Sequence, residues 1–307
     1  MNEEKNLFQE ELKERIAKIN ASLRLFLPAE CGFQKNLLAA CNYSVENGGK
    51  RLRPLFMQLA YELCQSQDAK GEPFGENTDK ALLPFMAAIE MIHSSSLVHD
   101  DLPCMDNDRL RRGKLSTWAK YGEDMGTLAG DGLMIYAVEI ACKSEAAPER
   151  KAEAIRILTA KTGIYGMIGG QSVDVELTGS RPTKEELTFI YRNKTGALLE
   201  AAFMIGGVLV GASPEIVKKL EEAAGAVGMA FQIEDDILDE TATEEALGKP
   251  TGSDERNEKV TWLTYYGLEQ SRADVRAYTE RAVSCLEEIG QLPFLTELCR
   301  MLIDRRS

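Results

Sequence analysis

The sequence predicts an all-α protein. Apolar residues recur at helical spacing through most of the chain, sustained two-residue alternation is hard to find, and ten prolines divide the chain into long tracts. The proline-free tracts 104–147, 183–213 and 215–249 each have room for several helical turns. No segment has the length or composition of an interdomain linker, so we expect one domain over residues 1–307.

The expected helices follow from apolar stripes along the chain. The first covers residues 8–26, where apolar side chains step by three or four positions before Pro28 ends the helix. The same period predicts helices over 82–102, 124–142, 151–170, 184–211, 215–239 and 272–290. Polar, glycine-containing segments predict loops at 65–80, 178–184 and 240–257.

Composition limits the possible partners and the compartment. The chain has 36 Lys+Arg against 49 Asp+Glu, a net charge of −13, which argues against nucleic acid or an anionic membrane surface. No stretch approaches the roughly 18 uninterrupted apolar residues of a membrane span, and the polar, acidic start is unlike a signal peptide. Seven cysteines without a CxxC pair indicate mostly buried thiols in a reducing environment. We therefore expect a soluble, cytoplasmic protein without stable membrane insertion.

Two aspartate clusters are the most unusual local sequences. Two histidines, His93 and His99, leave little material for a multi-histidine zinc site or a histidine-based triad. Each cluster follows an apolar helix, and adjacent carboxylates repel by about 4 kcal/mol at 4 Å and an effective dielectric of 20, so a cation is expected. The candidate metal ligands are Asp100, Asp101 and Asp106 in the first cluster, and Asp235, Asp236 and Asp239 in the second.

The ligand chemistry of these clusters favours magnesium. Asp235 and Asp239 are four residues apart and stack on one helix face, with Asp236 to the side. Oxygen ligands select hard cations, and Mg²⁺ usually takes one or two carboxylates together with water and substrate phosphate. One cluster alone is equally well explained by a solvated helix end. Two clusters that each follow an apolar helix favour a site for a Mg²⁺-bound phosphate ester.

Compact basic sets supply candidate phosphate contacts despite the acidic total. Arginine binds phosphate oxygens through its planar fork, whereas lysine acts as a point charge. Any single set is more often a solvated surface, and their placement near the aspartate clusters favours the functional interpretation. The sets are Lys50-Arg51-Leu52-Arg53 after a Gly-Gly pair, Arg111-Arg112-Gly113-Lys114, Lys194-Thr195, and Lys249 with Lys259.

Nine ordered motifs together resemble the trans-isoprenyl diphosphate synthases, the head-to-tail prenyl chain elongation enzymes. The resemblance runs from about residue 20 to the end of the chain. The motifs are GGKRLRP, DDLPCMD, LRRGK, LAGD, GGQSVD, KTGAL, FQIEDDILD, LGKPTGSD and EKVT. The chain departs from the family pattern at Leu115, Ser116 and Trp118, where Pro, Thr and His are common, and at Glu258, where Gly is usual.

The resemblance implies long antiparallel helices around a central cavity, as in isoprenoid synthases, and usually a homodimer. It implies that Mg²⁺, held by the six aspartates, promotes ionisation of an allylic diphosphate (dimethylallyl, geranyl or farnesyl), which isopentenyl diphosphate then attacks. The implied catalytic residues are Asp100, Asp101, Asp106, Arg111, Lys194, Asp235, Asp236 and Lys249. The implied allylic contacts are Arg111, Lys194, Thr195, Gln232, Lys249 and Lys259; the implied isopentenyl contacts are Lys50, Arg53, His93 and Arg112. Gln171 and Asp174 match a further motif near the metals.

The expected product is geranylgeranyl diphosphate. In the family, the residues four and five positions before the first aspartate form the cavity floor, and here these are the small residues Ser96 and Ser95. A farnesyl diphosphate synthase that stops at C15 remains the alternative. A terpene cyclase fits less well because its second metal motif usually mixes Asn, Ser or Thr and Glu, and a metal-dependent phosphohydrolase would need more histidines. A non-catalytic subunit of a heteromeric synthase would usually lack one aspartate motif, and both are present.

Overall fold

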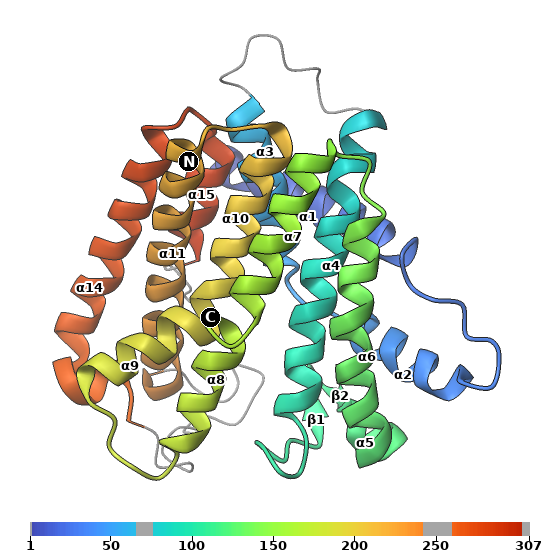
Figure 1. Cartoon of the computed structure of the whole chain (residues 1–307). Helices are drawn as coiled ribbons and strands as arrows, with labels where there is room; N and C mark the ends of the chain where they lie inside the picture. The colour runs from blue at the N-terminus through green and yellow to red at the C-terminus, as the bar shows by residue number, and fades with distance from the viewer. Residues whose placement is uncertain (1, 66–75, 242–259, 303–307) are drawn as a thin grey trace. The chain divides into compact units, whose positions relative to one another are not determined.

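The protein is all-α, as predicted, in a computed structural model that describes residues 2–65, 76–241 and 260–302 (Figure 1). Apart from helices, the described residues contain one short hairpin, formed by β1 (Leu110–Arg111) and β2 (Lys114–Leu115). The chain divides into two compact units, residues 1–58 with 72–155 and residues 59–71 with 156–307. We describe each unit by itself.

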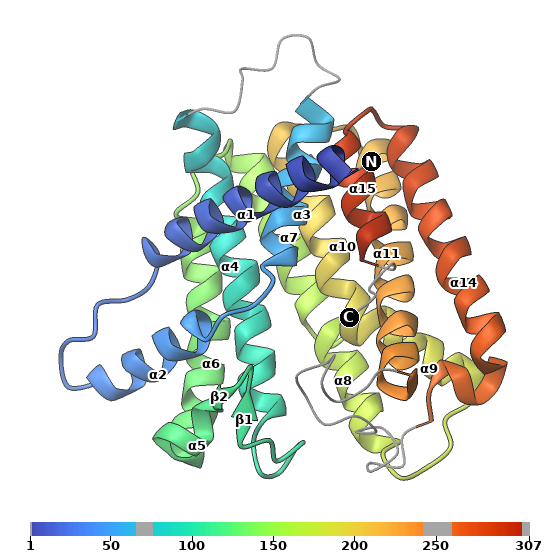
Figure 2. The same cartoon turned by 180° about the vertical axis from the view of Figure 1, so that it is seen from behind.

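The first unit is built around one apolar helix, α4 (Glu76–Asp100). Helix α6 (Glu123–Cys142) lies beside α4 in both views, and α1 and α2 also contact it (Figures 1 and 2). Large side chains of α4, including Phe85 and Ile89, are fully buried, so burial of this helix stabilises the unit. The other helices that begin in the unit are α1 (Asn2–Arg24), α2 (Lys35–Glu46), α3 (Leu52–Gln65), α5 (Thr117–Tyr121) and α7 (Pro148–Thr162).

The second unit packs its helices around α11 (Pro214–Thr241). Helix α14 (Trp262–Glu287) lies along α11 in both views, and α10 (Ala197–Val210) also packs against it (Figures 1 and 2). The helices α8 (Met167–Glu176), α9 (Lys184–Ile190) and α15 (Pro293–Met301) and the π-helix η1 (Tyr191–Gly196) complete it. A Cβ atom at Gly228 of α11 would lie 2.7 Å from the Cα of Gly196, the last residue of η1, so the backbones of α11 and η1 approach each other closely.

Three expected helices differ from the observed ones. The helix predicted over 151–170 is wrong, because α7 ends at Thr162 and α8 begins at Met167; at Gly166 between them, a side chain would collide with the Lys161 backbone. The helix predicted over 184–211 is a continuous helical path, but its middle turn widens into η1. Helix α14 starts before the predicted residue 272 and kinks at Gly267, where φ is 73°.

The remaining differences concern the short elements and the expected loops. Helices α2, α3, α5 and α15 and the hairpin were not predicted, because each is too short to show a clear apolar period. The expected loop at 178–184 is confirmed up to Thr183, the N-cap of α9. Residues 66–75 of the expected loop 65–80 and residues 242–257 of the expected loop 240–257 lie outside the described residues. The described ends of these two expected loops, residues 65, 76–80, 240 and 241, are helical, so the loop prediction is wrong there.

All seven cysteines are free, and the reducing environment that the sequence indicates stays a prediction. The prediction that most are buried is only partly correct, because Cys31, Cys104 and Cys142 are exposed. Burial raises the pKa of the Cys64 thiol to about 12, which keeps this thiol protonated and unreactive.

Three helices are long and apolar enough to cross a membrane, judged by length and composition alone. In Lys80–Asp100 and Lys184–Val210, 72% of the most apolar window is buried inside the protein, against 39% in Glu123–Cys142. The apolar residues of the first two therefore serve internal packing, whereas α6 leaves Leu128 and Ile135 exposed, with the exposed Asp131 between them. The absence of membrane insertion stays a prediction.

Candidate functional site

The first aspartate motif lies where α4 ends. The helix ends at Asp100, and the chain then folds back so that the Asp106 N–H donates to the carbonyl of Asp100 over 2.9 Å. Asn107 follows with a left-handed backbone, φ 55°, which completes the turn. The turn thus brings together two carboxylate-bearing residues that are six positions apart in the sequence.

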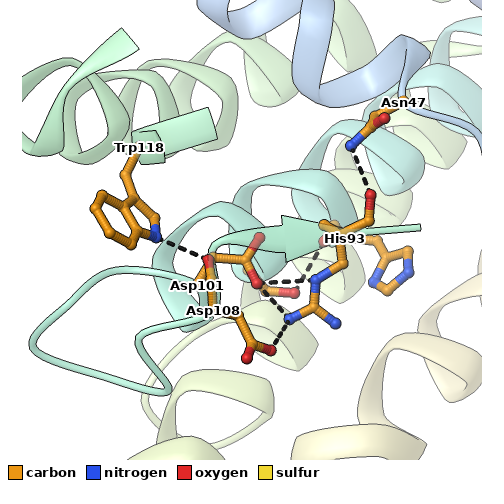
Figure 3. Close-up of polar contacts among 7 residues, drawn as sticks. Asn47, His93, Asp101, Asp108 and Trp118 are labelled. Atoms are coloured by element: carbon orange, nitrogen blue, oxygen red, sulfur yellow. Dashed lines mark hydrogen bonds and ion pairs between the residues drawn. The ribbon is translucent and has the colours of Figure 1, made fainter. Parts of the chain in front are cut away.

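Asp101 is the buried member of the first motif, and protein donors bind its carboxylate. It is buried, and the Arg111 Nε donates to its Oδ1 over 2.8 Å, while the same guanidinium reaches Asp108 at 3.2 Å (Figure 3). Burial raises the pKa of Asp101, and the bond from Arg111 acts against that shift. Asp101 therefore holds Arg111 in place beside the motif.

Trp118 fastens the loop after the first motif. Its indole N–H donates to the backbone carbonyl of Asp108 over 2.9 Å (Figure 3), and the Arg109 guanidinium lies over its ring at 5.3 Å. Trp118 occupies a position where the related family commonly has histidine. The indole N–H is a donor as an imidazole N–H is, so the departure from the family pattern leaves the loop with a fixed anchor.

A cluster of cations lies beside this motif, in the same unit. The guanidinium of Arg112 donates to the Gly48 carbonyl, which connects the hairpin turn to the GGKRLRP segment. Arg53 has a buried Nε without a hydrogen-bond partner, and burial lowers the pKa of its guanidinium to about 10, so Arg53 stays charged at neutral pH. Lys50, also predicted here, is exposed.

The histidine of this cluster is neutral near pH 7. His93 lies on α4 and is half-buried. Burial and the positive charges of neighbouring arginines, Arg53 first among them, hold the pKa of His93 well below 6.5. A neutral imidazole still donates one N–H, so His93 is able to bind a phosphate oxygen without adding charge.

Arg51, which belongs to the first predicted basic set, and Glu90, which was not predicted, complete the cluster. Arg51 and Glu90 form a buried ion pair, with Arg51 Nη1 2.7 Å from Glu90 Oε1. A single glutamate inside the apolar run of α4 is the signal that would have found the pair, because a buried carboxylate needs a partner. We refer to Arg51, Arg53, Glu90, His93 and Arg112 as the cationic cradle.

The second unit contains a pocket lined by five of the residues that the sequence motifs select, Asp174 included. Its volume is about 100 Å³, and it is open to solvent. Lys194 Nζ lies 2.5 Å from Asp174 Oδ2, and the Thr195 hydroxyl donates to Gln232 Oε1 over 2.7 Å. Lys194 and Thr195 both lie in η1, and wider helical turns of this kind often occur at functional sites. The predicted residues that line the pocket are Lys194, Thr195, Gln232 and Asp236, with Asp174 beside Lys194.

The second aspartate motif separates its carboxylates as the first one does. Asp235 and Asp239 are half-buried and one helical turn apart on α11. Asp236 is buried, and its carboxylate accepts hydrogen bonds from the Tyr191 hydroxyl and, over 3.0 Å, from the backbone N–H of Trp262. Each motif therefore has one buried carboxylate and two that are more exposed to solvent.

The donor set fits a magnesium ion that binds together with its substrate. Among the described residues, no group of three or more His, Cys, Asp or Glu side chains is close enough to enclose a metal ion. Mg²⁺ does not require such a cage, because it usually binds through one or two carboxylates and completes its shell with water and phosphate oxygens. Asp100, Asp106, Asp235 and Asp239 are the carboxylates that would hold it.

Several predicted site residues stay untested. Lys249 and Lys259 lie outside the described residues. Ser95 is fully buried, and the Ser96 hydroxyl donates to the His93 carbonyl. Gln171 is half-buried on α8. The two motifs lie in different units, so the central cavity between them stays a prediction.

The chain belongs to the polyprenyl synthetase family, whose model matches residues 34–292. It is 40% identical to a farnesyl diphosphate synthase of Geobacillus stearothermophilus over 251 residues, 80% of each chain. It is 41% identical to a geranylgeranyl diphosphate synthase of Cyanophora paradoxa over 243 residues, 78% of this chain and 77% of the other. A geranyltransferase from Helicobacter pylori, solved with magnesium and isoprenyl diphosphate, matches with a TM-score of 0.80 at 31% identity and covers 96% of both chains. The chain is therefore a short-chain prenyltransferase.

Proposed function

We propose that the chain joins isopentenyl diphosphate to an allylic diphosphate with Mg²⁺ as cofactor, and that geranylgeranyl diphosphate is its main product. The observation that carries the proposal is that both aspartate motifs keep accessible carboxylates beside phosphate-binding cations. Asp100 and Asp106 lie near Arg111 in one unit, while Asp235 and Asp239 share a helix with Gln232, the partner of Thr195, in the other.

The chain's own groups account for binding and orientation. Bound Mg²⁺ supplies positive charge that stabilises the departing diphosphate. Arg111 and Lys194, each held by an aspartate, present fixed cations to the allylic diphosphate, and the cationic cradle receives isopentenyl diphosphate. The proton lost after condensation goes to the departing diphosphate, so no protein base is needed. This agrees with a chain that has two histidines, one of them neutral and surrounded by arginines.

The C20 product rests on Ser95 and Ser96. Both side chains are small, and Ser95 is fully buried with a hydroxyl that has no hydrogen-bond partner. The relatives named above include both a C15 and a C20 synthase at nearly equal identity, 40% and 41%, so overall similarity does not choose between the products. The residues at the cavity floor, Ser95 and Ser96, must therefore decide the length of the prenyl product.

One assay tests activity and product together. Purified protein with Mg²⁺, isopentenyl diphosphate and dimethylallyl or farnesyl diphosphate should yield mainly geranylgeranyl diphosphate by chromatography. Chelation of Mg²⁺, Asp100→Ala and Asp235→Ala should each abolish turnover, because chelation removes the positive charge that stabilises the leaving group and each variant removes a carboxylate that would hold this ion. A product that stops at C15 would overturn the chain-length assignment, and unchanged rates in both variants would overturn the two-motif mechanism.

We also propose a homodimer through the outer face of α6. Leu128 and Ile135 are 50% and 74% exposed, and they lie seven residues apart, hence on one face of the helix. Exposed apolar residues on one helix face are typical of protein interfaces. A cytoplasmic location and the absence of nucleic-acid partners remain predictions from composition.

A further inference from the structure

We propose that the buried Arg51–Glu90 ion pair positions the cationic cradle for isopentenyl diphosphate, so that both are positioning residues for the homoallylic substrate. The proposal rests on the proposed function, because it names the residues that shape one of its two substrate sites. Neither side chain is accessible to a substrate, as Arg51 is 5% and Glu90 2% exposed. Their effect must therefore pass through Arg53, His93 and Arg112.

The guanidinium of Arg51 connects three helical elements of the first unit. Nη1 contacts Glu90 of α4 at 2.7 Å, Nε donates to Asn20 Oδ1 of α1 over 2.8 Å, and Nη2 donates to the Val45 carbonyl of α2 over 2.7 Å. These bonds use the full fork of the guanidinium, which lysine is unable to reproduce. Arg51 thus fixes the segment between α2 and α3 against its surroundings.

The backbone of this segment shows that it is held by those bonds. Arg51 has φ 51°, in the left-handed region that non-glycine residues rarely adopt. It follows Gly48 and Gly49, with φ 87° and 132°, so the path turns sharply before α3 begins. A strained conformation of this kind persists where surrounding contacts over-determine it. Without the Arg51 fork, the segment would relax toward a more common conformation.

Such relaxation would displace the residues that bind substrate. Gly49 lies directly against Arg112, because a Cβ atom there would be 2.7 Å from the Arg112 Nη1. Arg53 follows Arg51 by two residues, and its buried Nε has no hydrogen-bond partner within the protein. Both cations therefore depend on the path of residues 48–53, and the unpartnered nitrogen indicates a ligand that is still to bind.

Glu90 also sets the net charge of the cradle. Its carboxylate pairs with Arg51 and raises the pKa of both Arg53 and Arg112, against the lowering by burial. Three guanidinium groups and one carboxylate leave 3 − 1 = 2 positive charges, with His93 neutral. This excess suits a diphosphate, and loss of Glu90 would leave three cations to repel one another in the absence of substrate.

Steady-state kinetics of four variants test the proposal. Arg51→Lys, Glu90→Gln and Arg51→Gly should each raise KM for isopentenyl diphosphate by about 10- to 100-fold, because small displacements at a binding site have effects of this size. KM for the allylic diphosphate should change by less than about threefold. Asn20→Ala, which removes one bond and leaves no charge unpaired, should raise KM for isopentenyl diphosphate by about threefold to tenfold.

A double variant separates positioning from stability. Arg51→Gly suits the left-handed backbone, and Arg51→Gly combined with Glu90→Gln leaves no buried charge unpaired, so its thermal midpoint should recover toward that of the wild type. Its KM for isopentenyl diphosphate should stay high, because the fork that fixes the segment is absent. Recovery of both quantities together, or a KM that no variant changes, would overturn the proposal.

A matched control and a binding measurement complete the experiment. Glu200 is a buried carboxylate in the second unit whose partner Lys161 is 21% exposed and also pairs with Glu221. Glu200→Gln should therefore lower the thermal midpoint and leave KM for isopentenyl diphosphate unchanged. Calorimetric titration with inorganic diphosphate, without Mg²⁺, reports on the cradle even if the wild type shows no turnover. Absent turnover contradicts the proposed function, whereas equal diphosphate affinity in wild type and Glu90→Gln contradicts the positioning role.

Discussion

At the scale of single residues, the aspartates of each motif divide into two kinds. Asp101 and Asp236 are buried and bound by protein donors, from Arg111 in one case and from Tyr191 and Trp262 in the other. The sequence predicted six equivalent metal ligands because spacing shows which residues share a helix face, and it does not show which carboxylate a distant donor reaches. Tyr191 lies 45 residues before Asp236, so no local pattern indicates their contact.

Removal of the Tyr191 hydroxyl should destabilise the protein, because the buried Asp236 loses one of its hydrogen-bond donors. Tyr191→Phe should lower the free energy of unfolding by about 1–3 kcal/mol, the usual penalty for a buried polar group that loses its partner. Urea titration followed by circular dichroism measures this change. The control is Tyr43→Phe, whose hydroxyl donates to the Leu115 carbonyl in an exposed setting and should cost less. Equal losses in the two variants would contradict the assigned role of Tyr191.

At the scale of elements, the long helices were predictable and their interruptions were not. The apolar stripes of α4, α6 and α11 extend over many turns, so their positions follow from the period of the sequence. At the break between α7 and α8, Gly166 lies against the backbone of Lys161, and η1 meets Gly170 of α8 and Gly228 of α11 at backbone distance. The two contacts of η1 join segments that are distant in the chain, so the sequence alone shows only that a glycine is present.

The approach of α11 to η1 should be sensitive to one added carbon atom. Gly228→Ala would place a Cβ atom 2.7 Å from the Gly196 Cα, so the helices must separate. We expect a loss of about 1–3 kcal/mol in the free energy of unfolding, as for overpacked interiors, measured by thermal and urea unfolding. Gly132→Ala on α6, whose added carbon would lie 3.8 Å from Cys41 Sγ, should be neutral or stabilising. A stable Gly228→Ala protein would contradict the close packing.

At the scale of the whole molecule, an acidic protein concentrates its cations where phosphate is expected to bind. The net charge of −13 argues against polyanions as partners, yet three arginines meet in the cradle around a single glutamate. Composition reports the sum of charges and not their arrangement. For the same reason, the average hydrophobicity does not indicate assembly, whereas the exposed Leu128 and Ile135 on one face of α6 do.

Assembly is testable through α6. Leu128→Asp combined with Ile135→Asp should convert a dimer into monomers, because charge at the centre of an apolar interface is not compensated. Size-exclusion chromatography with light scattering gives the mass of the particle. Leu7→Asp, at an exposed leucine of α1, is the matched control and should leave the mass unchanged. A wild-type protein that is monomeric at micromolar concentration would contradict the proposed dimer.

Stability should fall when the solution becomes mildly acidic. The pKa of His93 is well below 6.5 in the folded protein, so below pH 6.5 the unfolded chain binds more protons than the folded one. The contribution of His93 is complete above pH 6.5 and is lost by up to about 1.4 kcal/mol per pH unit as pH falls toward the folded pKa. Urea titrations at several pH values should show a shallower slope for His93→Gln. The control His99→Gln keeps His93 and should lose stability with falling pH as the wild type does. Identical slopes for wild type and His93→Gln would contradict the role of His93.

The hairpin β1–β2 has one more consequence, for the tolerance of the chain to insertions. Its two-residue turn, with φ 56° at Arg112 and 75° at Gly113, is of the type that closes a tight hairpin. Arg111 bonds to the first aspartate motif, and its neighbour Arg112 bonds to the segment before α3, so the proposed contacts to the two substrates fall on adjacent residues. Surface loops usually accept extra residues, but one residue inserted here would reverse the faces of the hairpin and separate the two diphosphate positions. Length variation among relatives should therefore be absent from these six residues.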